Sequence, residues 1–323
     1  ERCCKGLDIL REKPKMRNDI DLTICIPTNG IVEWVFPVLD SIFQQKDADS
    51  LRYEVIVTDN GNNSSFKAGI KRYEEKYSNL KYYENHETGF LNQVACFKKA
   101  RGKFVKFINH RMLMLPGSVQ YLLEYVEEAE ADQTPIYFSN GVLDKEKRMQ
   151  CCSFDEFISK LSIYTTWSGG LAYWNTERIL TSTAEDYNAL FPHFYILSME
   201  TDRAKYYIDD HELTTSVSAD ETKKGVYDFY YAFAVEFPSL LLQLNREGKI
   251  DIQTFLSVKR ELLEWIADQF INYRILRTKT AYDLSNFPQT VYVYWGNFEF
   301  WKRVTTRFCS RVLGRVFQLK KWR

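Results

Sequence analysis

The chain has 323 residues, of which 45% are hydrophobic and 27% are charged, and this composition excludes a disordered or fibrous protein. Lys plus Arg (43) equals Asp plus Glu (43), so the total charge does not indicate a nucleic-acid partner. The balance is not local, because residues 301–323 contain eight basic side chains and no acidic one, against 35 basic and 43 acidic residues before them. Such asymmetry predicts a dedicated contact surface at this end of the chain.

Neither a membrane-spanning segment nor a zinc site is expected. The longest apolar stretch, Phe229 to Leu244, is interrupted by Glu236 and Pro238 and is shorter than the roughly 18 to 20 apolar residues of a spanning helix. The seven cysteines lack the paired Cys-x-x-Cys spacing of a zinc site, which favours free thiols in a reducing cytoplasm. Because the first residue is Glu1 rather than Met, we expect a processed or trimmed end and infer no signal peptide.

From residue 22 onward, short apolar runs alternate with stretches of helical periodicity. Strands are expected at 22–26, 53–58, 80–83 and 104–108, and helices at 32–45, 65–77, 92–100 and 116–130. This alternation predicts an α/β fold in which parallel strands are joined by helical crossovers, with a ligand crevice beyond the carboxyl ends of the strands. The crevice is expected to be surrounded by residues 27–30, 59–63 and 109–111.

The second half of the chain changes character. Residues 135–218 are less regular, and beyond residue 224 helical patterns cover 226–245, 251–277 and a final stretch from about residue 297. We therefore expect four segments: an N-terminal extension (1–19), an α/β domain (20–220), a helical subdomain (221–296) and a basic tail helix (297–323).

Several motifs follow the expected strands in a fixed order. The first strand ends in Ile-Pro-Thr-Asn (26–29), the second in Asp-Asn-Gly-Asn (59–62), and Thr-Gly-Phe-Leu-Asn-Gln (88–93) and Ala-Arg-Gly-Lys-Phe-Val-Lys-Phe-Ile (100–108) come before Pro116. Over residues 20–125 this order resembles the nucleotide-sugar half of family 2 glycosyltransferases. The resemblance implies a GT-A (Rossmann-like) domain with a mostly parallel mixed sheet. It also implies donor contacts from Pro27, Thr28, Asn29, Asp59, Asn60 and Asn92.

The segment Leu190 to Leu197 narrows the resemblance. Its Pro192-His193 pair is similar to the branch containing abequosyltransferase-like enzymes of bacterial surface-polysaccharide synthesis, in which a Pro-His helix replaces the usual acidic pair. The resemblance implies transfer of a hexosyl or deoxyhexosyl group from a nucleoside-diphosphate sugar to a lipid-linked or polymeric glycan acceptor. Enzymes of family 2 usually invert the configuration of the sugar, which requires one displacement and a general base.

Asp59 has two interpretations. A carboxylate at a strand end can accept hydrogen bonds from a nucleobase N–H group or a ribose hydroxyl, and the order of the surrounding motifs favours this role. The simpler interpretation is a turn, because Asp, Asn and Gly are the residues that turns prefer.

The position of the family's metal-binding Asp-x-Asp reads Asn109-His110-Arg111 in this chain. Mg²⁺ and Mn²⁺ prefer carboxylate oxygens, and this triplet has none. A guanidinium can contact a diphosphate directly through paired, charge-assisted hydrogen bonds. Our hypothesis is that Arg111, with His110, replaces the metal, so that no cofactor is required. Weak Mn²⁺ or Mg²⁺ ligation by Asn109 and His110 and a surface turn in a protein that has lost activity are the alternatives.

His193 is the first candidate for the base, and Asp186 is the second. An imidazole accepts a proton near neutral pH, although a histidine beside aromatic residues is more often a packed, hydrogen-bonded one. For the acceptor, we expect a floor formed by Trp167, Ser168, Gly169 and Gly170. Indole faces stack on sugars and glycines allow close approach of a ligand, while a strand bulge is the alternative for the glycines.

The tail has a basic stripe, because Arg303, Arg307, Arg311 and Arg315 recur every four residues. The opposing stripe is apolar and begins with Trp301. This pattern is typical of a helix that lies in an anionic membrane interface, so we expect a cytoplasmic protein bound peripherally to the inner face of the cell membrane. The alternatives are a helix packed on the helical subdomain with solvated arginines and, third, a nucleic-acid contact that nothing else in the chain supports.

Two other function classes compete with an active glycosyltransferase. The absent Asp-x-Asp is compatible with a catalytically inactive relative that binds a nucleotide sugar or a glycan as a partner subunit. Another nucleotide-binding α/β enzyme is disfavoured, because no Gly-x-Gly-x-x-Gly follows the first expected strand.

Overall fold

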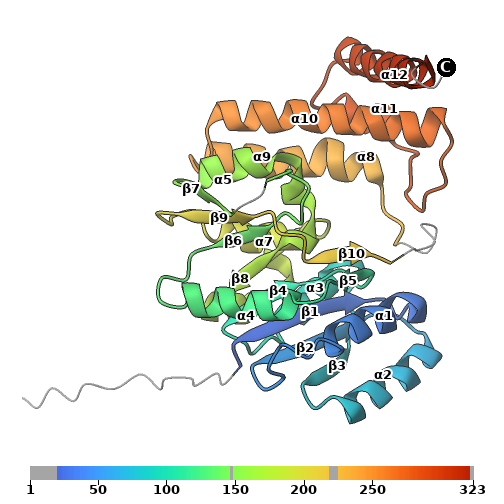
Figure 1. The fold of residues 1–323 in the computed structure, drawn as a ribbon. Coiled ribbons are helices and arrows are strands. Elements are labelled where there is room, and N and C mark those ends of the chain that lie inside the picture. The colour runs from blue at the N-terminus through green and yellow to red at the C-terminus, as the bar shows by residue number, and fades with distance from the viewer. Residues whose placement is uncertain (1–19, 146–147, 218–224, 321–323) are drawn as a thin grey trace, which may run out of the picture.

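A computed structural model describes residues 20–145, 148–217 and 225–320, with side chains as far as residue 313. Its central sheet has the strand order β3-β2-β1-β4-β8, and only the β4–β8 pair is antiparallel. The strands are β1 (Leu22–Thr28), β2 (Tyr53–Asp59), β3 (Leu80–Glu84), β4 (Phe104–Phe107) and β8 (Ala172–Trp174). The prediction of a mostly parallel mixed sheet is therefore confirmed, and the sheet lies in the lower half of Figure 1.

Helices cover both faces of this sheet. They are α1 (Val32–Phe43), α2 (Ser64–Lys76), α3 (Asn92–Phe97) and α4 (Ser118–Ala129). Successive side chains of a strand point to opposite faces, so Ile24 packs in the cluster that contains α1, α2 and α4, whereas its neighbour Cys25 packs in the cluster that contains α3. Burial on both faces explains why the strands have continuous apolar sequences.

A second, smaller layer of strands lies between the central sheet and the C-terminal helices (Figure 1). Its strands are β6 (Ile136–Phe138), β7 (Met149–Cys151) and β9 (Tyr206–Asp209), and β5 (Met112–Met114) pairs separately with β10 (Thr214–Ser216). The helices of this part are α5 (Phe154–Leu161), α6 (Glu177–Thr181) and α7 (Pro192–Ser198). Short 3₁₀ turns occupy Gly89–Leu91, Ser162–Thr166, Ser168–Gly170 and Ala184–Asp186.

The C-terminal part of the described chain is helical, as expected from the sequence. Its helices are α8 (Phe229–Tyr231), α9 (Phe237–Arg246), α10 (Ile252–Phe270), α11 (Phe287–Val291) and α12 (Asn297–Lys320). The expected single helix over 226–245 is interrupted by a π-helical turn, Ala232–Glu236, which ends two residues before Pro238. Proline lacks the N–H group that a regular helix needs at this position, which accounts for the widened turn. A second π turn, Ile271–Ile275, ends α10.

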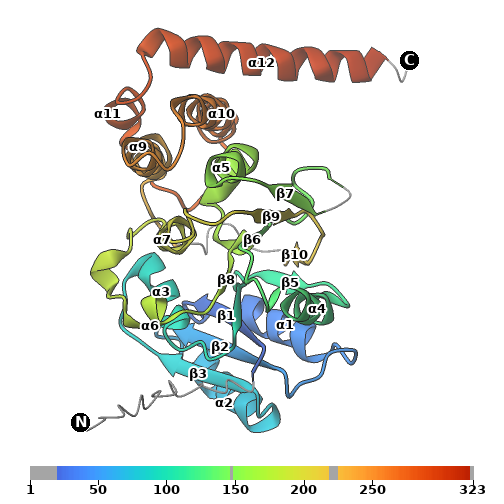
Figure 2. The ribbon, with the colours of Figure 1, turned by 90° about the vertical axis from the view of Figure 1, so that its left-hand side faces the viewer.

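The helical layer does not have a core of its own. One apolar cluster joins Phe157 of α5 and Ile208 of β9 with Phe237 of α9 and Leu262 of α10. The expected boundary near residue 220 therefore separates two kinds of secondary structure that share a core. This shared core holds the helices against the smaller layer of strands, and Figure 2 shows the helices, this layer and the central sheet stacked in that order.

The packing of α12 corrects the expected orientation of its arginines. Arg303 forms an ion pair with Glu264 of α10 at 3.0 Å, and both Arg307 and Arg311 pair with Asp268 of the same helix. These three arginines thus pair with acidic residues of α10, and a third or more of each side chain remains exposed. The side chain of Arg315 lies outside the described residues.

Another side of α12 is exposed and apolar. Phe298 is 81% exposed and Leu313 is 56% exposed, and three further exposed apolar side chains are Trp301, Phe308 and Val312. Val304, the next apolar residue after Trp301 in the chain, is instead buried against α10 at 4% exposure. None of the described helices is long and apolar enough to cross a bilayer.

Candidate active site

Two adjoining cavities lie between the carboxyl ends of the central strands and the helical layer. The first has a volume of about 450 Å³, and its wall includes residues that follow β1, β2 and β4. Seven of the residues predicted to bind the donor line it: Pro27, Thr28, Asn29, Asn60, Asn92, Asn109 and His110. The parallel strands bring these separate parts of the chain to one edge of the sheet, where ligands of α/β proteins bind.

The loops after β1 and β2 contact each other closely. A Cβ atom on Gly61 would lie 2.1 Å from the carbonyl oxygen of Asn29, so only glycine allows this approach. The Asn92 amide nitrogen donates to the carbonyl oxygens of Thr28 (2.8 Å) and Thr58 (3.1 Å), joining the ends of the same two strands. The wall of the first cavity is therefore built from tightly constrained backbone.

Asp59 lies behind this wall rather than on it. Its side chain is 1% exposed, and it does not line either cavity. One carboxylate oxygen accepts the N–H of Gly61 (2.7 Å) and the other accepts the Tyr82 hydroxyl (3.0 Å). Burial raises the pKa of Asp59, while these hydrogen bonds oppose the shift. The geometry thus favours the turn interpretation, with Asn60 facing the cavity.

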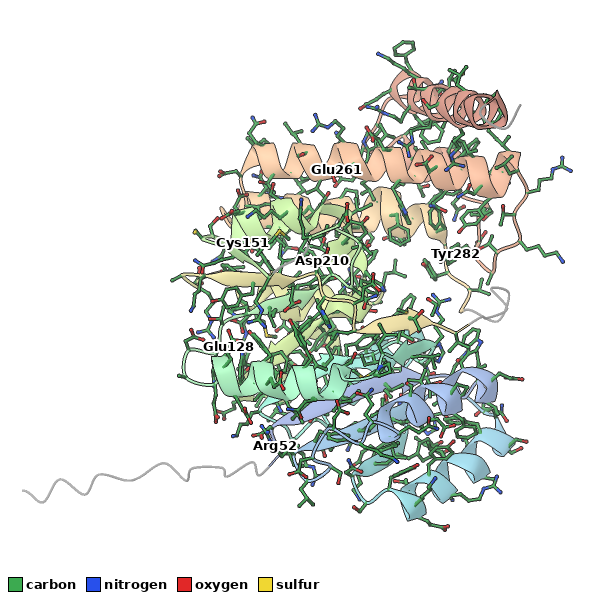
Figure 3. All side chains as sticks on the ribbon, viewed as in Figure 1. Arg52, Glu128, Cys151, Asp210, Glu261 and Tyr282 are labelled. Atoms are coloured by element: carbon green, nitrogen blue, oxygen red, sulfur yellow. The ribbon has the colours of Figure 1, made fainter. Side chains whose placement is uncertain are left out.

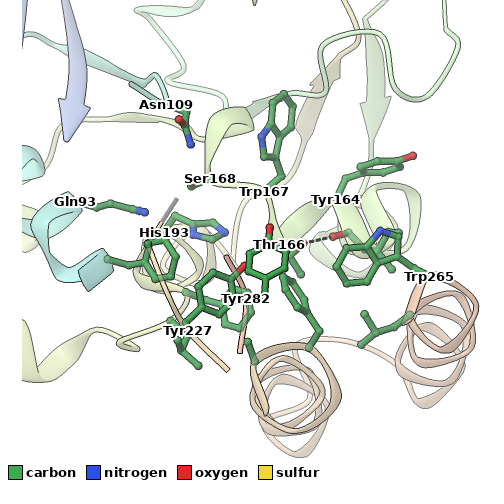
Figure 4. Close-up of a pocket in the computed structure, with 18 of the residues that line it drawn as sticks. Gln93, Asn109, Tyr164, Thr166, Trp167, Ser168, His193, Tyr227, Trp265 and Tyr282 are labelled. Atoms are coloured by element: carbon green, nitrogen blue, oxygen red, sulfur yellow. Dashed lines mark hydrogen bonds between the residues drawn. The ribbon is translucent and has the colours of Figure 1, made fainter. Parts of the chain in front are cut away.

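The second cavity, of about 370 Å³, is rich in aromatic side chains. Aromatic rings from three parts of the chain line it: Phe90, Tyr164, Trp167, Phe191, Tyr227, Phe233, Trp265 and Tyr282. Figure 4 shows Asn109 and Gln93 on one side and Trp265 on the other, and Figure 3 shows Tyr282 reaching from the helical layer toward the sheet. Aromatic faces of this kind bind the C–H surfaces of sugars.

The helical layer contributes to this cavity in a way that the sequence motifs did not predict. Tyr227, Trp265 and Tyr282 lie in segments that are far from the predicted motifs in the sequence. The available signal was weak, because aromatic residues on amphipathic helices usually belong to the core. Trp265 lies on α10, whereas Tyr227 and Tyr282 lie in loops of the helical layer, and only the position of this layer makes the three rings part of the site.

The predicted acceptor floor is a 3₁₀ turn, Ser168–Gly170, rather than a strand bulge. Trp167 and Ser168 line the second cavity, but Gly169 and Gly170 do not. A Cβ atom would lie 2.7 Å from the Trp167 ring at Gly169 and 2.1 Å from the Tyr137 ring at Gly170. The glycines therefore make room for two aromatic rings of the protein, which differs from the expected contact with a ligand.

A buried lysine supports this turn from below. Lys106 of β4 is 1% exposed, and its amine donates to the carbonyl oxygens of Phe107 (3.0 Å), Gly169 (2.5 Å) and Leu171 (3.3 Å). Burial lowers the pKa of Lys106 to about 7. The lysine fixes the turn that carries Trp167 and Ser168 to the edge of the sheet.

The two cavities meet at the Asn109-His110-Arg111 segment after β4. Asn109 and His110 line both cavities, and Arg111 is the only fully charged side chain among the described residues that line them. Burial lowers the pKa of Arg111, which nonetheless stays protonated at any physiological pH. A negatively charged group bound in the cavities would therefore lie near this guanidinium.

This segment is poorly suited to bind a hard divalent cation. It offers no carboxylate, and His110 Nδ1 lies 2.8 Å from the Thr28 hydroxyl oxygen, so this nitrogen is already in a hydrogen bond. No cluster of three His, Cys, Asp or Glu side chains occurs anywhere in the described parts of the chain. The residues at the Asp-x-Asp position thus do not fit Mg²⁺ or Mn²⁺.

The two candidate bases lie in different surroundings. His193, near the start of α7, is 2% exposed, lines the second cavity and has its Nε2 atom 3.0 Å from the carbonyl oxygen of Thr165. Asp186 is exposed and caps a 3₁₀ turn through the Thr183 N–H group (2.7 Å). It lines a separate hollow with Arg178 and Asn188, outside both cavities. The geometry therefore favours His193 and gives Asp186 a capping role.

A match to a protein-family model decides which family this chain belongs to. The model of glycosyl transferase family 2 matches residues 23–191, which is more than half of the chain. The chain belongs to glycosyltransferase family 2. Glycosyl transfer is therefore its reaction class. The matched residues include nearly all of the central sheet and the cavity-lining residues up to Phe191.

Solved structures show the same GT-A fold. Residues 1–349 of TarS from S. aureus, in complex with UDP-GlcNAc, superpose with a TM-score of 0.58 at 16% identity, covering 88% of this chain and 82% of that one. The mannosyltransferase PcManGT from Pyrobaculum calidifontis, in complex with GDP-Man and Mn²⁺, gives a TM-score of 0.51 at 15% identity, covering 92% and 87%. No curated protein matches the chain at a significant level. The narrower similarity to abequosyltransferase-like enzymes stays a prediction.

Proposed function

We propose that this protein transfers a sugar from a nucleoside-diphosphate donor to a glycan acceptor, with inversion and without a metal ion. The observation that carries the proposal is the meeting of two cavities at the Asn109-His110-Arg111 segment. The donor would occupy the first cavity and the acceptor sugar the aromatic one, so that the reacting groups come together where the two adjoin. Arg111 would then contact the diphosphate.

The proposed reaction is a single displacement. The acceptor oxygen forms a bond to the anomeric carbon while the bond from that carbon to the diphosphate oxygen breaks. The hydroxyl proton passes to Nδ1 of His193, and the nucleoside diphosphate leaves with the electron pair, its charge stabilised by Arg111. His193 suits this role because its buried Nδ1 has no partner among the described residues.

The proposed reaction needs no metal ion, although a similar structure contains one. PcManGT was solved with GDP-Man and Mn²⁺, whereas the corresponding strand end in this chain has no carboxylate. A guanidinium supplies the positive charge and the hydrogen bonds that a cation would otherwise bring to a diphosphate.

We assign the acceptor to the class of lipid-linked or polymeric glycans of bacterial surface-polysaccharide synthesis. The sequence motif around His193 supports this class, and TarS, a structural neighbour, binds UDP-GlcNAc. A lipid-linked acceptor would bring the enzyme to the inner face of the cell membrane. The exposed apolar side of α12, which includes Phe298, Trp301 and Leu313, is the surface that we assign to the membrane contact, in place of the arginines.

The decisive experiment combines binding with turnover. A thermal-shift screen over nucleotide sugars, with and without Mn²⁺, should identify a donor that stabilises the protein equally in both conditions. Release of nucleoside diphosphate from that donor should then continue in EDTA. Binding without any hydrolysis or transfer would instead favour the alternative hypothesis, based on the missing Asp-x-Asp, that the protein is a catalytically inactive relative.

A further inference from the structure

Thr28 connects the end of β1 to His110 through two hydrogen bonds. The N–H of Gly30 lies 3.0 Å from the Thr28 hydroxyl oxygen, and that oxygen lies 2.8 Å from His110 Nδ1. A backbone N–H group can only donate, so the hydroxyl accepts from Gly30. Its own hydrogen remains, and His110 Nδ1 is the acceptor within reach among the described residues. Thr28 is 3% exposed, which leaves little access for water.

This direction determines the protonation of the imidazole. If Nδ1 accepts the Thr28 hydrogen, it carries no proton of its own, and the neutral ring has its N–H group at Nε2. Burial and the neighbouring charge of Arg111 lower the pKa of His110 to about 3, so the ring stays neutral at physiological pH. In this tautomer His110 is a hydrogen-bond donor through Nε2 and holds no lone pair on that atom for a metal.

The position of the ring makes this donor useful. His110 lines both cavities, and the edge-to-face contact with Trp34, at 5.1 Å between ring centroids and 82° between planes, fixes the orientation of the imidazole. With Nδ1 bound to Thr28, Nε2 is the polar atom that His110 can offer to a ligand. His110 is also next to Arg111 in the chain, and both residues line the second cavity.

We propose that Thr28 holds His110 as its neutral Nε2–H form, and that this N–H donates a hydrogen bond to the diphosphate of the sugar donor. The proposal rests on the proposed function for the identity of the ligand. Thr28 is then a positioning residue, and His110 is a ligand-binding residue whose contact strengthens as negative charge develops on the leaving group. Arg111 and His110 would both contact the diphosphate, Arg111 through its positive charge and His110 through an oriented N–H group.

The first part of the test uses the free protein. Nitrogen-15 NMR of the histidine side chains, with the His110 signals assigned by their loss in His110→Gln, should show protonated Nε2 and unprotonated Nδ1 in the wild type. Thr28→Ser keeps the hydroxyl and should preserve this pattern, whereas the isosteric Thr28→Val should give a mixture of tautomers. A proton on Nδ1 in the wild type, or an unchanged pattern in Thr28→Val, overturns the role of Thr28.

The second part adds UDP, GDP, CDP and ADP in turn. A nucleotide that binds should move the His110 Nε2–H resonance, and Thr28→Val should bind it about tenfold more weakly than Thr28→Ser does. Binding that leaves this resonance in place overturns the diphosphate contact. If none of the four binds, the diphosphate contact and the donor part of the proposed function fail together. The free-protein spectra still decide whether Thr28 sets the tautomer.

Discussion

His193 Nε2 lies 3.0 Å from the carbonyl oxygen of Thr165. A carbonyl can only accept, so Nε2 carries the proton and the lone pair of the neutral ring is on Nδ1. Both rings have the same proposed tautomer, but Thr165 occupies the Nε2–H donor of His193, whereas Thr28 occupies the Nδ1 acceptor of His110. The same cavity wall therefore presents one histidine suited to take a proton and another suited to donate a hydrogen bond.

His193→Gln should lower turnover by roughly two to four orders of magnitude, the usual contribution of a general base, with little change in nucleotide binding. Burial lowers the pKa of His193 to about 4. Because the base must be unprotonated, the wild-type rate should stay level from pH 7 to about 5 and fall toward pH 4. Asp186→Asn is the matched control and should keep its activity. Near-normal turnover by His193→Gln, with an unchanged melting temperature, would exclude His193 as the base.

Arg111→Ala should weaken donor binding and reduce turnover by at least about tenfold, since a charge-assisted contact to the diphosphate is lost. Arg111→Lys keeps the charge without the planar pair of donors and should restore only part of the activity. Wild-type turnover should not change in EDTA. Inhibition by EDTA that Mn²⁺ reverses would contradict metal independence and leave the weak Asn109 and His110 ligation as the better explanation.

Trp265→Ala should raise the KM for the acceptor by about tenfold or more while hydrolysis of the donor alone continues at the wild-type rate. The indole lies in the wall of the aromatic cavity, where stacking on a sugar is lost without a change in the first cavity. Phe298→Ala, which removes an exposed ring on α12, is the control for an aromatic deletion far from the site. An equal loss of donor hydrolysis and transfer in Trp265→Ala would argue that the cavity holds the donor instead.

Replacing Phe298 and Leu313 by Ser should reduce the recovery of the protein with anionic liposomes in a flotation assay. These side chains are exposed, so their burial in the interface would contribute binding free energy. Arg303→Gln should have a smaller effect, because Arg303 is already paired with Glu264. Recovery that depends on the arginine and is indifferent to the two apolar residues would contradict the revised contact surface.

Lys106 predicts a pH dependence of stability. Its pKa is about 7 in the folded protein, against roughly 10.4 in an unfolded chain, so between these values the unfolded state binds more protons. The free energy of unfolding should therefore include a contribution that rises with pH between about 7 and 10. Urea unfolding at pH 7 and pH 9.5 should show a smaller rise for Lys106→Met than for the wild type. Parallel behaviour of the two proteins would mean that the buried amine keeps its proton.

Much of the fold could be predicted because it depends on local patterns. The apolar run that became β1 and the helical spacing that became α2 were recognised within a few residues of their observed ends. The site was recognised only in part. Asn109, His110 and Arg111 lie where the motif order placed them, whereas the exposure of Asp59 could not be read from its position after a strand. Burial of a strand-end carboxylate depends on Tyr82 of the neighbouring strand, and no local pattern encodes that contact.

The sequence by itself determined the order of strands and helices, the family and the absence of carboxylates from the Asp-x-Asp position, because these are properties of neighbouring residues. The tertiary structure decided which side of α12 is covered, since that depends on Glu264 and Asp268 of another helix. It also decided that Trp265 and Tyr282 share a cavity with His110, although more than 150 residues separate them from it in the chain. Amphipathic periodicity identifies two sides of a helix, and only the packing partner determines which of them meets solvent.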